Sequence, residues 1–107
     1  MSRRHEPRAR GQEEQRVVDV LEDALRGLAQ RFPAGAVYFY DVGCPGCGES
    51  DADFARLRVW VAGPRGPAAV YALCARCAPG TTRPARAVLL RAEARLLEGW
   101  RATRPQG

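Results

Sequence analysis

The chain has 107 residues, a formal net charge of +5 and a sequence pI near 9.6, with 17 arginines and no lysine. A chain of this length usually forms one domain with a modest core, and it has no apolar stretch long enough to span a bilayer, which argues against an integral membrane protein. Lysine, isoleucine and asparagine are all absent while Ala, Arg, Gly and Pro are abundant, so a GC-rich source genome explains the choice of arginine. The positive sign of the net charge still favours an anionic partner.

Residue types that support catalysis are scarce. His5 is the only histidine, and Ser2 and Ser50 are the only serines, so no Ser-His-Asp set exists. The chain also has no glycine-rich phosphate-binding loop. The sequence therefore predicts a protein that is not an enzyme. Nothing in residues 1–16 has the apolar run of a signal peptide, and we expect a cytoplasmic protein.

Residues 1–10 carry four arginines against one glutamate, and Pro7 interrupts them. We expect a disordered basic tail here, which is either a solvated terminus or an arm that binds nucleic acid. Residues 11–102 are expected to form a single zinc-ribbon-like domain with flanking helices, and residues 103–107 a frayed terminus.

Residues 12–32 have the pattern of an amphipathic helix. Its apolar residues recur at steps of three and four, namely Val17, Val18, Leu21, Leu25, Leu28 and Phe32. Acidic residues gather toward its N-terminal half, which suits the helix dipole, and Pro33 and Gly35 end the pattern. We expect the apolar stripe to pack on a sheet, and a homodimer interface between helices is the alternative.

A strand is expected over residues 36–42, where both alternating faces are apolar. It leads directly into the segment Cys44-Pro45-Gly46-Cys47-Gly48. Pro45 has a restricted φ and Gly48 can adopt a positive φ. The segment can therefore turn tightly and direct backbone N–H groups toward the cysteine sulfurs.

Residues 57–62 and 68–73 are expected to form an antiparallel hairpin. The connection between them, Gly63-Pro64-Arg65-Gly66-Pro67, is rich in turn-forming residues. A turn centred on Arg65 predicts the cross-strand pairs Leu57–Leu73, Val59–Tyr71 and Val61–Ala69, all on one face. The hairpin then brings Cys74 next to the first cysteine pair.

The second cysteine pair, Cys74-Ala75-Arg76-Cys77, begins after 26 intervening residues, and the chain has no other cysteines. Cys44, Cys47, Cys74 and Cys77 can surround one Zn²⁺ tetrahedrally, and four protein ligands leave no position for water, so the metal is expected to be structural. Iron or a redox function is the first alternative. A pair of disulfides is the second, and it requires an oxidising compartment.

The first cysteine pair resembles those of the zinc-ribbon superfamily, which often read Cys-Pro-x-Cys-Gly. The resemblance covers roughly residues 36–80 and implies a metal site, but zinc ribbons have so many functions that it implies no particular one. The second pair departs from the pattern because Ala78 stands where glycine is common. Gly80 is expected to make the turn instead.

Residues 83–101 are predicted to form a second amphipathic helix, with Thr81 or Thr82 as its cap and Pro84 in its first turn. One apolar stripe comprises Leu89, Ala92, Leu96 and Trp100. The expected fold is therefore α+β, a small three-stranded antiparallel sheet with a four-cysteine zinc-ribbon site, flanked by an N-terminal and a C-terminal helix.

Positive charge concentrates in the C-terminal half of the chain. A candidate nucleic-acid-binding surface comprises Arg56, Arg58, Trp60, Arg65, Arg76, Arg83 and Arg86. The alternative is that these arginines are ordinary solvated residues and that Trp60 packs under a helix. The side of the sheet on which Trp60 lies distinguishes the two interpretations.

We expect a small zinc-binding protein that acts as a nucleic-acid-associated or regulatory adaptor. The alternative is a protein–protein docking module, homodimeric or not, without nucleic-acid contact. Two apolar helical stripes in so short a chain favour this alternative, because one three-stranded sheet is too small to cover both.

Overall fold

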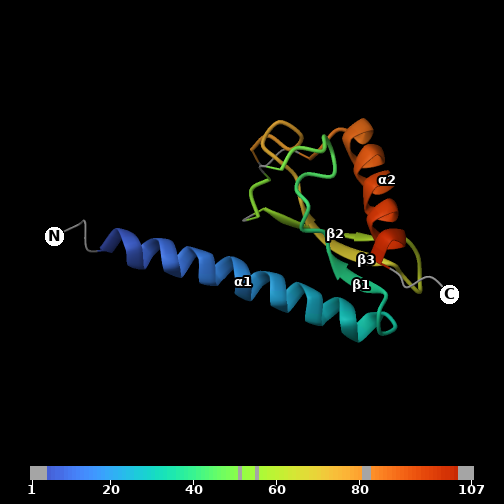
Figure 1. Cartoon of the computed structure of the whole chain (residues 1–107), viewed down its shortest axis with the longest axis horizontal. Coiled ribbons are helices and arrows are strands. Elements are labelled where there is room, and N and C mark those ends of the chain that lie inside the picture. Colours follow the sequence, from blue (N-terminus) through green and yellow to red (C-terminus); the bar gives the residue numbers. More distant parts are fainter. Residues whose placement is uncertain (1–4, 51, 55, 81–82, 104–107) are drawn as a thin grey trace.

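The computed structural model describes residues 5–50, 52–54, 56–80 and 83–103, and for residues 5–13 it describes the backbone alone. Two helices flank a three-stranded sheet, as expected for an α+β fold (Figure 1). In chain order the elements are α1 (His5–Arg31), β1 (Val37–Phe39), β2 (Leu57–Val61), β3 (Ala68–Ala72) and α2 (Arg86–Thr103). Within these residues, neither helix has the length and apolar character needed to cross a membrane.

The sheet is mixed, with strand order β1-β3-β2, which corrects the expectation of a purely antiparallel sheet. β2 and β3 form the predicted antiparallel hairpin, whereas β1 pairs with β3 in parallel. The reason is that β1 and β3 each lead into a cysteine pair. Strands that run in the same direction end at the same edge of a sheet and bring both pairs together. An antiparallel β1 would have left the first pair at the opposite end.

The register between β2 and β3 is shifted by one residue from the predicted one. The sequence pattern places Val59 opposite Tyr71, but in the structure Val59 lies opposite Val70. The observed pairs are Leu57–Ala72, Arg58–Tyr71, Val59–Val70, Trp60–Ala69 and Val61–Ala68. Because side chains alternate along a strand, the shift puts Tyr71 on the face opposite to Val59.

The turn between the two strands explains this shift. The Gly66 N–H donates to the Gly63 carbonyl at 3.0 Å, so residues 63–66 form a four-residue β-turn. Pro64 and Arg65 occupy its two central positions. The turn is therefore centred between these two residues and not on Arg65, as the sequence pattern had suggested.

β3 is the central strand, and all five of its residues are buried. Ala68 and Val70 pack in the cluster that contains Leu28 of α1, whereas Tyr71 packs in the cluster that contains Leu96 of α2. The helices thus cover opposite faces of the sheet (Figure 1). An apolar strand without polar alternation is typical of a strand covered on both faces.

α1 begins at His5, seven residues before the pattern predicts. Residues 5–10, where the sequence predicts a disordered tail, are helical in the structure, and residues 1–4 lie outside the described part of the chain. Good helix formers dominate this stretch, and Pro7 is tolerated because it lies in the first turn, where its missing N–H is not needed.

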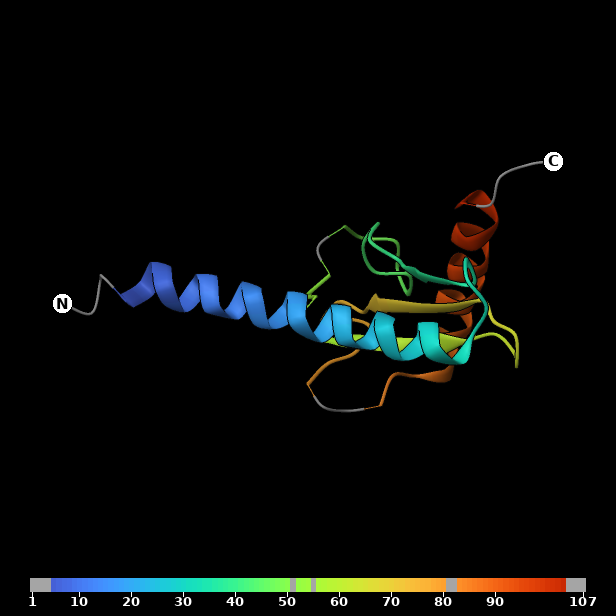
Figure 2. The ribbon, with the colours of Figure 1, turned by 90° about the horizontal axis from the view of Figure 1, so that it is seen from below.

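The N-terminal half of α1 projects away from the rest of the molecule (Figure 2). Its 27 residues make a helix about 40 Å long, whereas a strand of 5 residues spans about 17 Å. The radius of gyration is accordingly 15.4 Å, against about 13 Å for a compact chain of this length. Among the side chains described in α1, Leu28 is buried while Val18 and Val20 are exposed.

α2 begins three residues later than the pattern predicts. Pro84 is buried and precedes the helix instead of lying in its first turn. The predicted caps at residues 81–82 lie outside the described residues, as do residues 104–107 of the predicted frayed terminus. Thr103 is the last helical residue, and its Oγ donates to the Trp100 carbonyl at 2.8 Å.

Candidate metal centre

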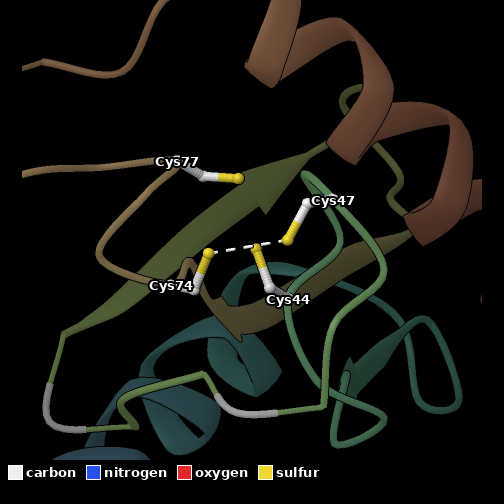
Figure 3. Close-up of side chains that lie close together, drawn as sticks. All are labelled: Cys44, Cys47, Cys74 and Cys77. Carbon is white, nitrogen blue, oxygen red and sulfur yellow. Dashed lines mark hydrogen bonds between the residues drawn. The ribbon is translucent and has the colours of Figure 1, made fainter.

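The four cysteines converge at one end of the sheet (Figure 3). Their Sγ atoms all lie within 4.8 Å of one another, and those of Cys47 and Cys74 are 3.5 Å apart. Zinc–sulfur bonds of about 2.3 Å in a tetrahedron separate the sulfurs by about 3.8 Å, so the cluster has the size that a tetrahedral metal site requires. A disulfide requires about 2.05 Å, and all four cysteines are free. The four sulfurs can therefore hold a metal ion.

Backbone hydrogen bonds close the first knuckle, which we define as residues 44–48. The Gly48 N–H donates to the Cys44 carbonyl at 2.8 Å, and the Cys44 N–H donates to the Glu49 carbonyl at 2.7 Å. Gly48 has a φ of +85°, as the sequence predicts. Cys44 is buried in this turn, whereas Cys47 remains partly exposed to solvent.

Gly46 of the first knuckle lies directly against the second cysteine pair, a contact that the sequence did not reveal. A Cβ at this position would lie 2.9 Å from the Cys77 sulfur and 3.0 Å from the side chain of Val88. Only glycine lets the first knuckle approach the second this closely without displacing a ligand. The glycine itself was visible between the first two cysteines, but its contact is made across the fold.

The second knuckle, residues 74–78, is closed in the same way. The N–H groups of Cys77 and Ala78 both donate to the Cys74 carbonyl, at 3.1 and 2.9 Å. Gly80 has a φ of +59°, which confirms that it turns the chain where Ala78 cannot. The two knuckles thus hold their cysteines in similar local turns.

The surroundings of the thiols separate their pKa values. Burial raises the pKa of Cys74, but hydrogen bonds from the Cys77 backbone and the Cys47 side chain overcome this effect and lower it to about 6. Burial raises the pKa of Cys77. A hydrogen bond from the Glu49 backbone lowers the pKa of Cys47, but burial and hydrogen bonds with Cys74 and Cys44 outweigh it, so the pKa is raised. A metal must therefore displace protons from Cys47 and Cys77, and its affinity falls as the pH falls.

Two arginines of α2 hold the first knuckle from outside the sulfur cluster. Arg95 Nη1 donates to the Pro45 carbonyl at 2.9 Å, and Arg91 Nε donates to the Gly46 carbonyl at 3.1 Å. Neither residue stood out in the sequence. The only signal that the sequence carries is their spacing of four, which places both on one face of the helix.

Two residues of the predicted nucleic-acid-binding surface lie beside the metal centre. Arg56 Nη1 donates to the Ala78 carbonyl of the second knuckle at 3.2 Å, and Arg56 Nε lies 3.9 Å from a carboxylate oxygen of Asp53. Arg76 Nη2, in the middle of the second knuckle, lies 3.9 Å from Oε1 of Glu49, the residue after the first knuckle, so this exposed ion pair links the two segments. Both arginines have contacts within the fold.

Arg58 and Trp60 lie on the sheet face that α2 covers. Trp60 is half-buried against the core, and its Nε1 donates to Glu93 of α2 at 3.2 Å. Arg58 Nε is buried and has no hydrogen-bond partner among the described atoms. Because the indole packs within the fold, the main argument for base stacking is lost.

Arg65, Arg83 and Arg86 are exposed but lie in different places. Arg65 is in the β2–β3 turn, at the end of the sheet opposite to the cysteines, and lines a cavity of about 570 Å³. Arg83 and Arg86 lie just before α2 and at its first residue. The seven residues of the predicted surface thus belong to several separate parts of the structure.

Comparison with known proteins gives no match, whether with protein-family models, curated proteins or solved structures. The resemblance to zinc ribbons therefore rests on the cysteine pairs. The structure supports that resemblance at the level of a metal-binding cluster.

Proposed function

We propose that the four cysteines bind one structural Zn²⁺ and that the metal-stabilised fold serves as a protein-docking module, with the projecting half of α1 as its docking element. The observation that carries the docking proposal is the length of α1. A helix that extends well beyond its own sheet offers surface that the chain itself does not cover (Figure 2).

Zinc fits the site because four thiolates in a small domain are typical of structural zinc, and four sulfurs leave no coordination position for a catalytic water. The described residues between β1 and β2, and between β3 and α2, form no helix or strand. An ion that joins the two knuckles stabilises this part of the fold, where backbone hydrogen bonds are sparse. Because thiols that bind a metal persist in a reducing compartment, we propose a cytoplasmic location.

Metal analysis of protein purified from cells supplied with both zinc and iron tests the first part of the proposal. We expect one zinc per chain and no absorption in the visible range. Stoichiometric iron with visible absorption would assign the site to iron instead. A metal-free protein that still unfolds cooperatively would contradict a structural role for any metal.

The docking proposal rests on an exposed face of α1 where the helix leaves the sheet. Val18 is 42% exposed and lies at the centre of this face. Glu14 and Glu22 lie one turn before and one turn after Val18, so they share its face of the helix. Both carboxylates are exposed. The face is therefore apolar at its centre and acidic at its edges.

A surface with an apolar centre and a basic edge complements this face, and α2 of a second copy has that chemistry toward its N-terminal end. Leu90 is 57% exposed, and the exposed Arg86 lies one turn before it. Since α1 and α2 lie on opposite faces of the sheet, one chain cannot bring its own two surfaces together. We take a second copy as the occupant, with α1 of each chain packed on α2 of the other.

Light scattering after size-exclusion chromatography, over a concentration series, tests this arrangement. We expect dimers of the zinc-loaded protein, dissociation by Glu22→Arg, and restored dimers when Arg86→Glu is added to that variant. The matched control is Asp41→Arg, which reverses an exposed carboxylate outside the helices and should leave the dimer intact. A wild-type monomer at every concentration would exclude the second copy.

A nucleic-acid-associated or regulatory adaptor is the second candidate, and the exposed arginines at 65, 83 and 86 favour it together with the net charge of +5. Binding to duplex DNA and to structured RNA across a salt series tests it. A steep loss of affinity with salt, reduced by Arg83→Ala and Arg86→Ala together, would support phosphate contact. No binding at low salt would leave the arginines as solvated residues.

A further inference from the structure

The first knuckle is held by a helix that contributes no ligand to the metal centre. Arg91 and Arg95 each donate a hydrogen bond to a residue that lies between the ligands Cys44 and Cys47. Figure 3 shows α2 beside the loop that carries Cys47. Both arginines therefore act on the backbone that separates the first pair of ligands.

The position of Arg95 also depends on the missing side chain at Gly48. A Cβ at Gly48 would lie 3.3–3.7 Å from the guanidinium atoms of Arg95. The guanidinium thus lies over the turn, close to its backbone. Arg91 lies one helical turn before Arg95 and holds Gly46 in the same knuckle. The two side chains span the knuckle from Pro45 to Gly48.

The charges of these residues suit the centre they surround. Four thiolates and one divalent ion have a formal net charge of minus two, and guanidinium groups near such a centre stabilise the charged form of the ligands. Cys47 is the partly exposed cysteine, whereas Cys44, Cys74 and Cys77 are buried. A chelator that removes the metal therefore reaches the first knuckle first, and the knuckle must move away from the second for the metal to leave.

We propose that Arg91 and Arg95 are positioning residues that keep the first knuckle closed over the metal and so slow its release. This inference rests on the metal-binding part of the proposed function. It assigns to the two arginines a kinetic role that is separate from ligation, because neither donates an atom to the metal. It also gives α2 a direct connection to the metal centre through two backbone carbonyls.

The test is the rate at which excess chromogenic chelator takes Zn²⁺ from the purified full chain. We expect the double variant Arg91→Ala, Arg95→Ala to release zinc at least about tenfold faster than the wild type, the lower end of what outer-sphere substitutions cost in metal binding. The matched control is Arg26→Ala, Arg101→Ala, which removes the same charge from two exposed positions on the helices. Its release rate should stay within about twofold of the wild type.

The lysine variants Arg91→Lys, Arg95→Lys cover the case in which the alanine variant does not fold. They retain the charge but lose the planar guanidinium, so we expect an intermediate release rate. In Co²⁺-loaded protein, the visible bands report ligand geometry and should shift in the alanine variant but not in the Arg26→Ala, Arg101→Ala control.

The inference would be overturned if the alanine variant released zinc at the wild-type rate, or if the lysine variant did so where the alanine variant does not fold. Equal acceleration in the Arg26→Ala, Arg101→Ala control would also overturn it, because the effect would then be one of net charge and not of position. A wild-type protein that binds no metal at all would instead contradict the proposed function.

Discussion

The two helices are joined to the sheet in different ways. α2 buries Ala92 and Leu96 to 1% and 0% exposure and holds the first knuckle through two arginines. α1 is half as long again, yet Leu28 is its one buried side chain among those described, and its N-terminal half projects from the molecule. α2 therefore packs into the core beside the cysteine cluster, while the projecting part of α1 leaves surface that the rest of the described chain does not cover.

The largest expected effect is that of Cys77→Ser, which removes one ligand from the metal-centre side of the molecule. We expect metal retention and the cooperative unfolding transition to be lost together, because metal binding and folding of this region are coupled. Zinc content and a circular-dichroism melt measure the two effects on the same sample. A variant without zinc that keeps its melting transition would show that α2 and the sheet fold independently of the metal.

Truncation of one side chain on each helix gives the next largest difference. Leu96→Ala leaves a cavity in the core under α2 and should lower the free energy of unfolding by about 2–5 kcal/mol. Val20→Ala changes a side chain that is 55% exposed on α1, and we expect a change within about 0.5 kcal/mol. Denaturant unfolding of the zinc-loaded proteins measures both. Similar losses at both positions would mean that α1 contributes to the core as much as α2 does.

Two glycine substitutions should change the stability of the fold in opposite directions. In Gly46→Ala the new methyl group meets the Cys77 sulfur at 2.9 Å, so we expect weaker zinc binding and a loss of about 1–3 kcal/mol in stability. In Gly27→Ala, within α1, the methyl group has no neighbour within 4 Å, and helix propensity should raise the stability by up to about 1 kcal/mol. Thermal melts and competition with a chelator distinguish the two. Equal changes in melting temperature and zinc affinity for the two variants would contradict the close approach of the two knuckles.

The smallest expected effect is a change in the number of protons that zinc displaces. The pKa of Cys74 is lowered from 9.0 to about 6, so its thiolate stabilises the fold fully above pH 9, and this contribution is lost as the pH falls through about 6. For Cys47 and Cys77, whose pKa values are raised, the contribution has the opposite sign: it is present below pH 9 and is lost as the pH rises through their folded values.

If the second knuckle keeps its hydrogen bonds before the metal arrives, zinc should displace one proton fewer above about pH 6 than below it. Calorimetry of zinc binding in buffers of different ionisation enthalpy counts these protons. The same number at every pH would show that the second knuckle forms only when the metal binds.

Some features could be predicted from the sequence because neighbouring residues encode them. The apolar periodicity of residues 12–32 and 83–101 located both helices to within a few residues, apart from the early start at His5. The spacing of the cysteines identified the metal cluster, since each pair needs only a tight local turn with Gly48 or Gly80. These are properties of short segments, and their physical causes lie within those segments.

Other features depend on which segments meet, and only the tertiary structure decided them. β1 is parallel to β3 because both cysteine pairs must reach the same end of the sheet. The β2–β3 register depends on where the turn closes, and β3, which is apolar on both faces, has no alternation that would fix it. Arg91 and Arg95 were ordinary residues in the sequence, and Trp60 was there a candidate for base stacking. Their roles arise because α2 packs across the sheet beside the first knuckle, a contact between segments that lie far apart along the chain.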